Sequence, residues 1–367
     1  MRNAAIVLAL FLISSLFYPN TGQANPGVSA NNAVLMEQSS GRVLFERQAH
    51  EQQPIASITK IMTAIIAIES GELNETVTVS NRAVNAIGSS IYLENGEKIK
   101  LKDLVYGLML RSGNDAAVAI SEHVGGSMEG FVHLMNQKAE WLGMTNTSFD
   151  NPHGLDSDNH YSTAYDMALL MRYAMDNETF REVTKTESYK SENRAYSWKN
   201  KNKLLTGMYE HTNGGKTGFT RIAGRTLVSS ALKDDMELIA VTLDGPDDWR
   251  DHIGMFEWGF DNFDMTTIDQ KGETIYQMTD SGNRVTGYLH QNITLPLQKN
   301  EQEDIESKSF ILQDNPGAAE DVIGKTIYFV DAVPVTETPI YSERHESAFL
   351  SDIVSVYQLI TGFDSNG

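Results

Sequence analysis

The clearest pattern of hydrophobic positions in the chain lies between residues 57 and 69. Apolar side chains recur there at the three- and four-residue spacing of a helix buried on most of its surface, at Ile58, Ile61, Met62, Ile65, Ile66 and Ala67. Pro54 stands just ahead of the run and Gly71 follows it, as is usual at helix boundaries. The pattern predicts a buried helix that begins near Ser57 and ends at Glu69.

Other elements follow from the same kind of periodicity. Strand composition and turn residues predict a strand, a tight turn and a strand over 33–45, and two more strands over 222–231 and 236–243. Helical spacing predicts further helices over 102–110, 116–124, 131–142, 162–175 and 250–260. Beyond Phe263 the composition changes to short alternating runs, such as 284–289 and 326–330, which predict a separate small β domain.

The two ends of the chain carry patterns of their own. The first 24 residues have the pattern of a signal peptide, with Arg2, an apolar run over 4–18 and the small residues of Gly22-Gln23-Ala24. This pattern predicts an exported protein, with an uncleaved anchor as the alternative. Segment 343–367 places its apolar residues on one side of a helix. That helix suits contact with a membrane surface, although it lacks the basic residues that usually assist this, and docking on another helix or subunit fits equally well.

Composition excludes several classes of function. A formal net charge of −20 argues against a nucleic-acid partner, because no basic stripe is present to neutralise phosphates. The chain contains no cysteine, so neither disulfides nor thiol chemistry are available. The nine histidines are scattered without a His-x-x-x-His pair, which predicts no metal site, and no cofactor is expected.

The predicted first helix carries candidate chemistry at its start. Ser57 and Lys60 lie one turn apart, as a nucleophile and a proton acceptor of a serine acylating enzyme must. A lysine in an otherwise apolar helix is costly to bury unless it has a partner or a function. The pattern alone is weak, because Ser230 and Lys233 repeat it at a predicted strand end, and a helix-capping serine with a solvated lysine is the simpler interpretation of either copy.

Two further patterns gain weight from their surroundings. Ser112-Gly113-Asn114 interrupts two predicted buried helices, a setting in which polar side chains are held rigidly. Lys216-Thr217-Gly218 lies on a predicted strand, where a lysine and a threonine can hold an extended peptide by its terminal carboxylate, although edge strands often carry lysines only for protection. His153 in a loop could be a base, but a hydrogen-bonded strut is the preferred interpretation.

Three motifs follow one another in the order found in serine penicillin-recognising enzymes: Ser57-x-x-Lys60, Ser112-Gly113-Asn114 and Lys216-Thr217-Gly218. Together with the neighbouring residues and Asn151-Pro152-His153-Gly154-Leu155, they resemble the low-molecular-mass penicillin-binding proteins that are D-alanyl-D-alanine carboxypeptidases. The resemblance covers roughly residues 32–263 and is greatest to the sporulation-associated carboxypeptidases of endospore-forming Gram-positive bacteria.

The resemblance implies an α+β fold with a catalytic domain over 25–263, in which helices flank an antiparallel sheet, and a β domain over 264–342. It implies that this protein removes the terminal D-alanine from peptidoglycan stem peptides and is trapped covalently by β-lactams. The implied roles are nucleophile for Ser57, base for Lys60, proton relay for Ser112, and substrate binding for Asn114, Lys216, Thr217, Gly218 and Phe219.

Two departures limit what the resemblance implies. Phe219 stands where some members have histidine, so only its backbone N–H is expected to take part, with that of Ser57, in an oxyanion hole. Arg250 lies about two positions from the place of a carboxylate-binding arginine and is expected to be auxiliary at most. The alternatives are a β-lactamase, which would need a Glu-x-x-Leu-Asn loop that is missing between Asn114 and Lys216, and a non-catalytic wall-binding protein.

Overall fold

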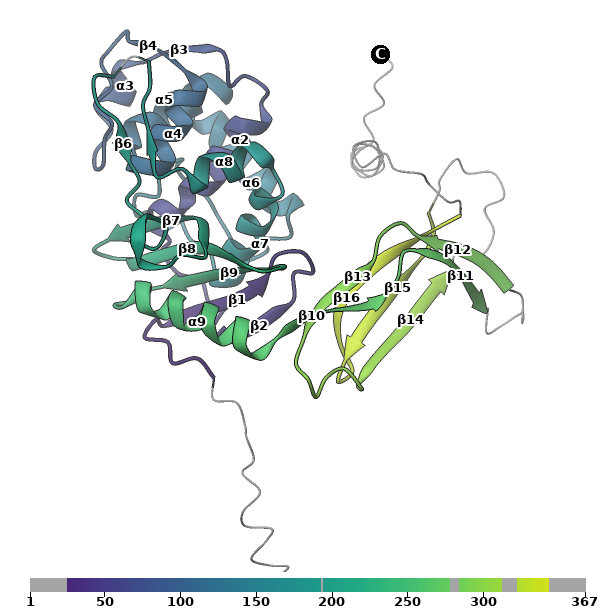
Figure 1. The fold of residues 1–367 in the computed structure, drawn as a ribbon. Helices are drawn as coiled ribbons and strands as arrows, with labels where there is room; N and C mark the ends of the chain where they lie inside the picture. Colours follow the sequence, from purple (N-terminus) through teal and green to yellow (C-terminus); the bar gives the residue numbers. More distant parts are fainter. Residues whose placement is uncertain (1–24, 193, 278–283, 312–321, 343–367) are drawn as a thin grey trace, which may run out of the picture.

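The computed structural model describes residues 25–192, 194–277, 284–311 and 322–342. The predicted signal peptide over 1–24 and the predicted amphipathic helix over 343–367 lie outside the described residues. Figure 1 shows a region of helices and sheet up to residue 262, followed by a region built of strands. This architecture confirms the predicted α+β fold class.

A five-stranded antiparallel sheet with the order β2-β1-β9-β8-β7 organises the first region. Its strands are β1 (Asn32–Glu37), β2 (Val43–Arg47), β7 (Thr212–Thr220), β8 (Gly224–Lys233) and β9 (Met236–Leu243). The strands predicted from the sequence over 33–45, 222–231 and 236–243 all belong to it. Because β1 pairs with β9, the two ends of this region meet at the centre of the sheet.

Both faces of the sheet are covered. Alternate residues of a strand point to opposite faces, and in β9 Ile239 belongs to the larger hydrophobic core whereas Leu238 packs with Phe256 of α9 (Asp248–Asn262). Figure 1 shows α9 against one face and the remaining helices against the other. The sheet is therefore the middle layer of three, which explains why β9 is buried along its whole length.

The helices on the larger face enclose a core of mostly aliphatic and methionine side chains. They are α2 (Lys60–Glu69), α3 (Asn81–Val84), α4 (Leu101–Arg111), α5 (Asn114–Val124), α6 (Met128–Trp141), α7 (Ala164–Met175) and α8 (Glu178–Lys185). Two short ladders join β3 (Thr76–Thr78) to β4 (Lys98–Lys100) and β5 (Ser188–Tyr189) to β6 (Trp198–Lys199). Short strand segments before residue 102 were expected from the sequence, whereas helix α8 and the ladder of β5 and β6 were not.

The predicted α-helical start at Ser57 is wrong in one respect. Residues Ala56–Thr59 form a 3₁₀ turn, η1, and the α-helix begins at Lys60. Ala56 has a left-handed backbone with φ of 49°, which turns the chain sharply just before the serine. Ser57 therefore stands on a tight turn rather than in the first turn of an α-helix, while α2 behind it is buried at every position except Glu69.

The second region consists of strands. β10 (Asp264–Asp269) pairs with β13 (Ile293–Leu297), and a second sheet has the order β11-β12-β16-β15-β14. Its strands are β11 (Gly272–Gln277), β12 (Arg284–Leu289), β14 (Ile305–Ile311), β15 (Val322–Val330) and β16 (Val333–Tyr341).

Arg42 of the first region donates hydrogen bonds to both carboxylate oxygens of Glu301, at 2.5 and 3.0 Å. The division into two domains at residue 263 stays a prediction.

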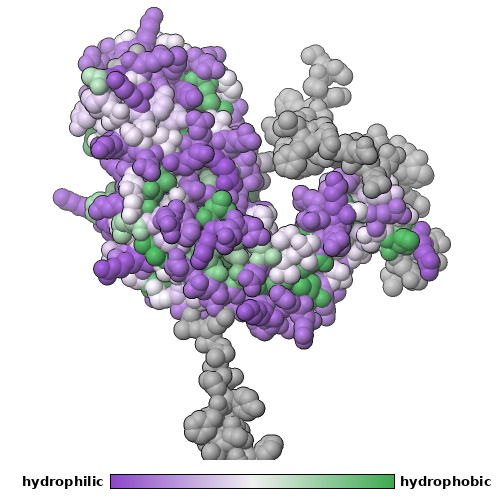
Figure 2. Space-filling view, viewed as in Figure 1, coloured by the Kyte–Doolittle hydropathy of each residue, from purple (hydrophilic) through white to green (hydrophobic). Residues whose placement is uncertain are grey.

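The surface is mostly polar on the face shown in Figure 2, where apolar residues form small, separate patches. Patches of that kind are ordinary on protein surfaces and need no partner to cover them. Among the described residues, no helix is long and apolar enough to cross a membrane.

Candidate active site

Ser57 and Lys60 are brought together by the turn that precedes α2. Lys60 Nζ lies 3.0 Å from Ser57 Oγ, 2.8 Å from Asn114 Oδ1 and 2.5 Å from the carbonyl oxygen of His153. The lysine is fully buried, whereas Ser57 is partly exposed. The serine hydroxyl is thus accessible to a ligand while the amine behind it is shielded from water.

The loop that contains His153 closes the site from behind. Thr63 Oγ1 donates to the carbonyl of Pro152 at 2.6 Å, and Asn151 Oδ1 accepts the N–H of Gly154 at 2.7 Å. Gly154 has φ of +87°, and a Cβ at this position would lie 1.9 Å from the carbonyl oxygen of Ala56. Only glycine permits this approach. The loop is therefore packed directly against the turn that carries the nucleophile candidate.

Ser112 and Asn114 are placed by the junction between α4 and α5. Ser112 caps α4 in a left-handed conformation with φ of 63°, which reverses the chain so that both side chains are buried at the site. Asn114 Nδ2 donates to the carbonyl of Ile87 at 2.5 Å, so its oxygen faces Lys60. Asp115 accepts the N–H groups of Ile91 and Leu93, which fixes the loop beside Asn114.

Lys216 and Thr217 lie on β7, the edge strand nearest the site. Lys216 is buried, and its Nζ lies 3.1 Å from Ser112 Oγ and 2.8 Å from the carbonyl oxygen of Thr217. A Cβ on Gly218 would lie 2.9 Å from the backbone nitrogen of Ser57, so the absence of a side chain brings β7 close to that nitrogen. Phe219 follows with its side chain exposed.

Burial controls the charge of both lysines. Desolvation lowers the pKa of Lys60 well below its ordinary value, and the positive charges of Lys216 and Lys201 lower it further, against the opposing effect of Asp115. Desolvation, with a smaller effect from Lys201, lowers the pKa of Lys216 to about 7. Burial and the second amine therefore both favour the neutral form of Lys60 over its charged form.

A pocket of about 360 Å³ opens beside Ser57, Ser112 and Thr217, whereas the buried Lys60, Asn114 and Lys216 lie behind its lining. It is lined by Ser57, Ser89, Ser112, Lys201, Lys203, Thr217, Gly218, Phe219, Arg225, Asp248 and Trp249. Lys201, Lys203 and Arg225 were missed in the sequence analysis, because they stand in no recognisable motif. Their positive charges suit an anionic ligand, although Arg225 is already paired with Asp248 at 2.7 Å.

The remaining candidates lie elsewhere or act differently. Ser230 is buried within β8, where its hydroxyl contacts the sulfur of Met175, so the second Ser-x-x-Lys copy forms no helical pair. Arg250 is exposed, 3.5 Å from Asp247, and does not line the pocket. The Nδ1 atom of His153 accepts the N–H of Leu155 at 3.3 Å, and desolvation lowers the pKa of this imidazole to about 3, which supports a structural role.

Comparison with known proteins agrees with this geometry. A family model described as D-alanyl-D-alanine carboxypeptidase, peptidase family S11, matches residues 20–247. The D-alanyl-D-alanine carboxypeptidase DacF of Bacillus subtilis is 31% identical over 357 residues, which cover 92% of each chain. DacC of Escherichia coli is 36% identical over 288 residues, which cover 71% of this chain and 68% of DacC.

The fold is shared with a solved structure of the same kind. Penicillin binding protein 5 from Haemophilus influenzae has a TM-score of 0.74 and 28% identity, over 87% of this chain and 98% of that one. Fold and site thus define a serine enzyme of the low-molecular-mass penicillin-binding class. The chain belongs to the D-alanyl-D-alanine carboxypeptidase family, and the predicted serine-type carboxypeptidase activity is confirmed at the level of the family.

Proposed function

We propose that this carboxypeptidase uses Ser57 to attack the carbonyl carbon of the penultimate D-alanine of a peptidoglycan stem peptide. The Ser57 Oγ–C bond forms, the bond to the nitrogen of the terminal D-alanine breaks, and that amine leaves with a proton. Lys60 accepts the proton of Ser57, and Ser112 passes a proton to the leaving nitrogen. Water then hydrolyses the ester, which restores Ser57 and releases the shortened peptide.

The hydrogen bonds of Lys60 carry this proposal. A neutral amine has two N–H groups and one lone pair. The oxygens of Asn114 and of the His153 carbonyl can only accept, so they occupy the two N–H groups. The third contact, at 3.0 Å, has Lys60 Nζ as the donor to Ser57 Oγ when the amine is charged, and once the amine is neutral its lone pair can accept the Ser57 O–H instead, as the activation of a nucleophile requires.

The binding roles are assigned to residues that line this pocket and to the buried polar groups directly behind it. The terminal carboxylate of the substrate would lie against Lys216 and Thr217, with Asn114 holding a substrate amide. The close approach of Gly218 to the nitrogen of Ser57 supports an oxyanion hole formed by the N–H groups of Ser57 and Phe219. No cofactor takes part in this scheme.

The cellular role rests on the activity. Removal of the terminal D-alanine eliminates the donor that cross-linking consumes, so the enzyme would limit cross-links in a cell or spore wall outside the cytoplasm. β-Lactams would acylate Ser57 as mimics of the terminal dipeptide. Any peripheral membrane contact would come from segment 343–367, and action on the spore wall stays a prediction.

Intact mass spectrometry after brief exposure to penicillin tests the mechanism, because Ser230 offers a matched control in the same Ser-x-x-Lys spacing. We expect a persistent adduct on Ser57, which Ser57→Ala lacks and Ser230→Ala retains. Ser57→Ala should also release D-alanine from a pentapeptide at least about 1,000-fold more slowly.

The other outcomes separate the alternatives. An adduct that disappears within seconds would favour a β-lactamase. Folded protein that binds the pentapeptide without an adduct or D-alanine release would favour a wall-binding protein. If only Ser230→Ala lost the adduct, the assignment of Ser57 as the nucleophile would be wrong.

A further inference from the structure

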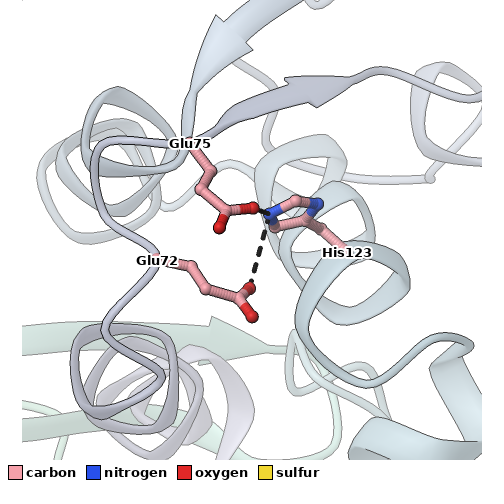
Figure 3. Close-up of side chains that lie close together, drawn as sticks. All are labelled: Glu72, Glu75 and His123. Atoms are coloured by element: carbon pink, nitrogen blue, oxygen red, sulfur yellow. Dashed lines mark ion pairs between the residues drawn. The ribbon is translucent and has the colours of Figure 1, made fainter.

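Three side chains with metal-ligating atoms meet where the segment after α2 passes the end of α5. Glu72 and Glu75 come from the segment between α2 and β3, and His123 comes from the last turn of α5. Figure 3 shows the two carboxylates and the imidazole pointing toward one another. The Nε2 atom of His123 lies 3.4 Å from Glu72 Oε2 and 3.5 Å from Glu75 Oε2.

These separations fit the edges of a small coordination sphere. Zinc binds imidazole nitrogen and carboxylate oxygen at about 2.0–2.2 Å, so two ligand atoms of a tetrahedral site lie roughly 3.3–3.6 Å apart. All three ligand atoms lie within 4.8 Å of one another. One cation could therefore bind all three with small side-chain adjustments. Glu75 is exposed, so the site has an open side by which a cation can enter and a water can supply a fourth ligand.

No hydrogen bond joins the members of the cluster. Glu72 Oε2 and His123 Nε2 have no exposed surface and no hydrogen-bond partner, and their contact at 3.4 Å is an ion pair only when His123 is protonated. Buried polar atoms are normally paired, because an unpaired one costs about 1–3 kcal/mol. The pair of His50 and Glu46 has a similar separation of 3.6 Å, but both of its side chains are more than half exposed and water can satisfy them.

We propose that Glu72, Glu75 and His123 form a binding site for a divalent first-row transition cation, with Zn²⁺ as the best fit. The imidazole ligand favours such a cation over Ca²⁺ and Mg²⁺, which prefer oxygen ligands throughout. Two carboxylates balance the charge of the ion, and the excess of acidic residues in the chain adds a favourable long-range field.

The position of the site suggests a structural role. Helix α2 begins at Lys60 and leads to Glu72 and Glu75, whereas α5 begins at Asn114 and ends beside His123. The hydrogen bond from Lys60 to Asn114 joins these helices at the catalytic end. A cation would join them again about 15 Å away, given a rise of roughly 1.5 Å per residue. It would act as a staple that holds the base and the asparagine in register.

Metal binding to the purified protein tests the proposal, after chelator treatment and dialysis. We expect one equivalent of Zn²⁺ to bind in competition with a fluorescent zinc indicator, with a Kd in the micromolar range or below. Saturating Zn²⁺ should raise the Tm by a few degrees. Co²⁺ should give a visible absorption band that Zn²⁺ removes and excess Ca²⁺ does not.

Two variants and one control make the result specific. His123→Asn and Glu75→Gln should each weaken Zn²⁺ binding by at least tenfold and reduce the rise in Tm, whereas His50→Asn should change neither. Because Glu75 is exposed, Glu75→Gln carries the test even if His123→Asn fails to fold.

Three results would contradict the proposed site. The first is that the protein shows no saturable Zn²⁺ binding, and the second is that both variants still bind Zn²⁺ as the unchanged protein does. The third is that His50→Asn weakens Zn²⁺ binding as much as His123→Asn does. An unchanged Tm with bound Zn²⁺ would remove the structural role.

Discussion

The amine of Lys60 and the side-chain oxygen of Asn114 lie 2.8 Å apart, although 54 positions separate the two residues in the chain. The bond ties the first residue of α2 to the first residue of α5. Because Ile87 holds the amide nitrogen of Asn114, the oxygen cannot turn away from the lysine. The protonation of Lys60 is therefore sensitive to what stands at position 114.

Asn114→Asp should shift the pH dependence of acylation to higher pH. A carboxylate beside Lys60 favours its ammonium form, raises its pKa and leaves less neutral base at pH 7. We expect the acylation rate at pH 7 to fall, by up to about tenfold for each unit by which the raised pKa exceeds 7, with recovery toward alkaline pH. Stopped-flow acylation by penicillin measures this. Asn85→Asp, at an exposed position, should leave the profile unchanged, and a uniform loss at every pH would contradict the argument.

Lys216→Arg should remove a falling limb from the pH profile of kcat/KM for a D-Ala-D-Ala peptide. The pKa of Lys216 is lowered to about 7 by burial, so the free enzyme loses this ammonium as the pH rises through 7 and binds a carboxylate less well. Arginine stays charged above pH 12. We expect the wild-type value to fall by up to about tenfold per pH unit beyond that point. Lys203→Arg should keep the limb, and persistence of the limb in Lys216→Arg would assign it to another group.

Gly154→Ala should destabilise the protein more than Gly143→Ala. Both glycines have positive φ, of +87° and +73°, but a Cβ meets nothing within 4 Å at Gly143 and would collide with the Ala56 carbonyl at Gly154. Left-handed backbone costs about 1–2 kcal/mol for a residue with a side chain, and the collision adds about 1–3 kcal/mol at position 154 alone. Urea denaturation compares the two, and equal losses would show that the loop moves away freely.

His252→Gln should make the free energy of unfolding less dependent on pH under acid conditions. His252 is fully buried between Ser229 and Thr242, and desolvation lowers its pKa to about 3. The unfolded state therefore binds a proton at this histidine below about pH 6.5, whereas the folded state binds it only below about pH 3. Because the unfolded state binds more protons between these values, the free energy of unfolding decreases as the pH falls from about 6.5 to about 3. The slope should decrease by about 1.4 kcal/mol per pH unit. An unchanged slope in His252→Gln would contradict the argument.

Much of the fold could be predicted from the sequence, because local periodicity reports burial directly. The pattern from Ile58 to Ile66 predicted α2, and strand composition predicted β8 and β9 in the central sheet. Helix α8 was missed since its short, strongly charged sequence shows no clear apolar run beyond Phe180 and Val183. The turn at Ala56 was missed as well, because packing of Gly154 against it imposes a backbone that alanine does not favour.

The site was only partly visible in the sequence. Motifs marked Ser57, Ser112 and Lys216, but no motif marks Lys201, in the loop before β7, or Arg225, which pairs with Phe219 from β8. The carbonyl of His153 also escaped, since a backbone oxygen leaves no signature in residue type. The sequence predicted no metal site because the search was for paired histidines, whereas the proposed cluster joins Glu72 and Glu75 to a single histidine far along the chain.

The contact between Gly154 and the carbonyl of Ala56 also constrains how the gene can vary. Every missense change of a glycine codon introduces a residue with a Cβ. Any such change at codon 154 would therefore bring that Cβ into collision with the Ala56 carbonyl, and no smaller change at this position is available. Resistance to penicillin that arises by reshaping the back of the site must therefore begin at another codon, or first alter the turn at Ala56.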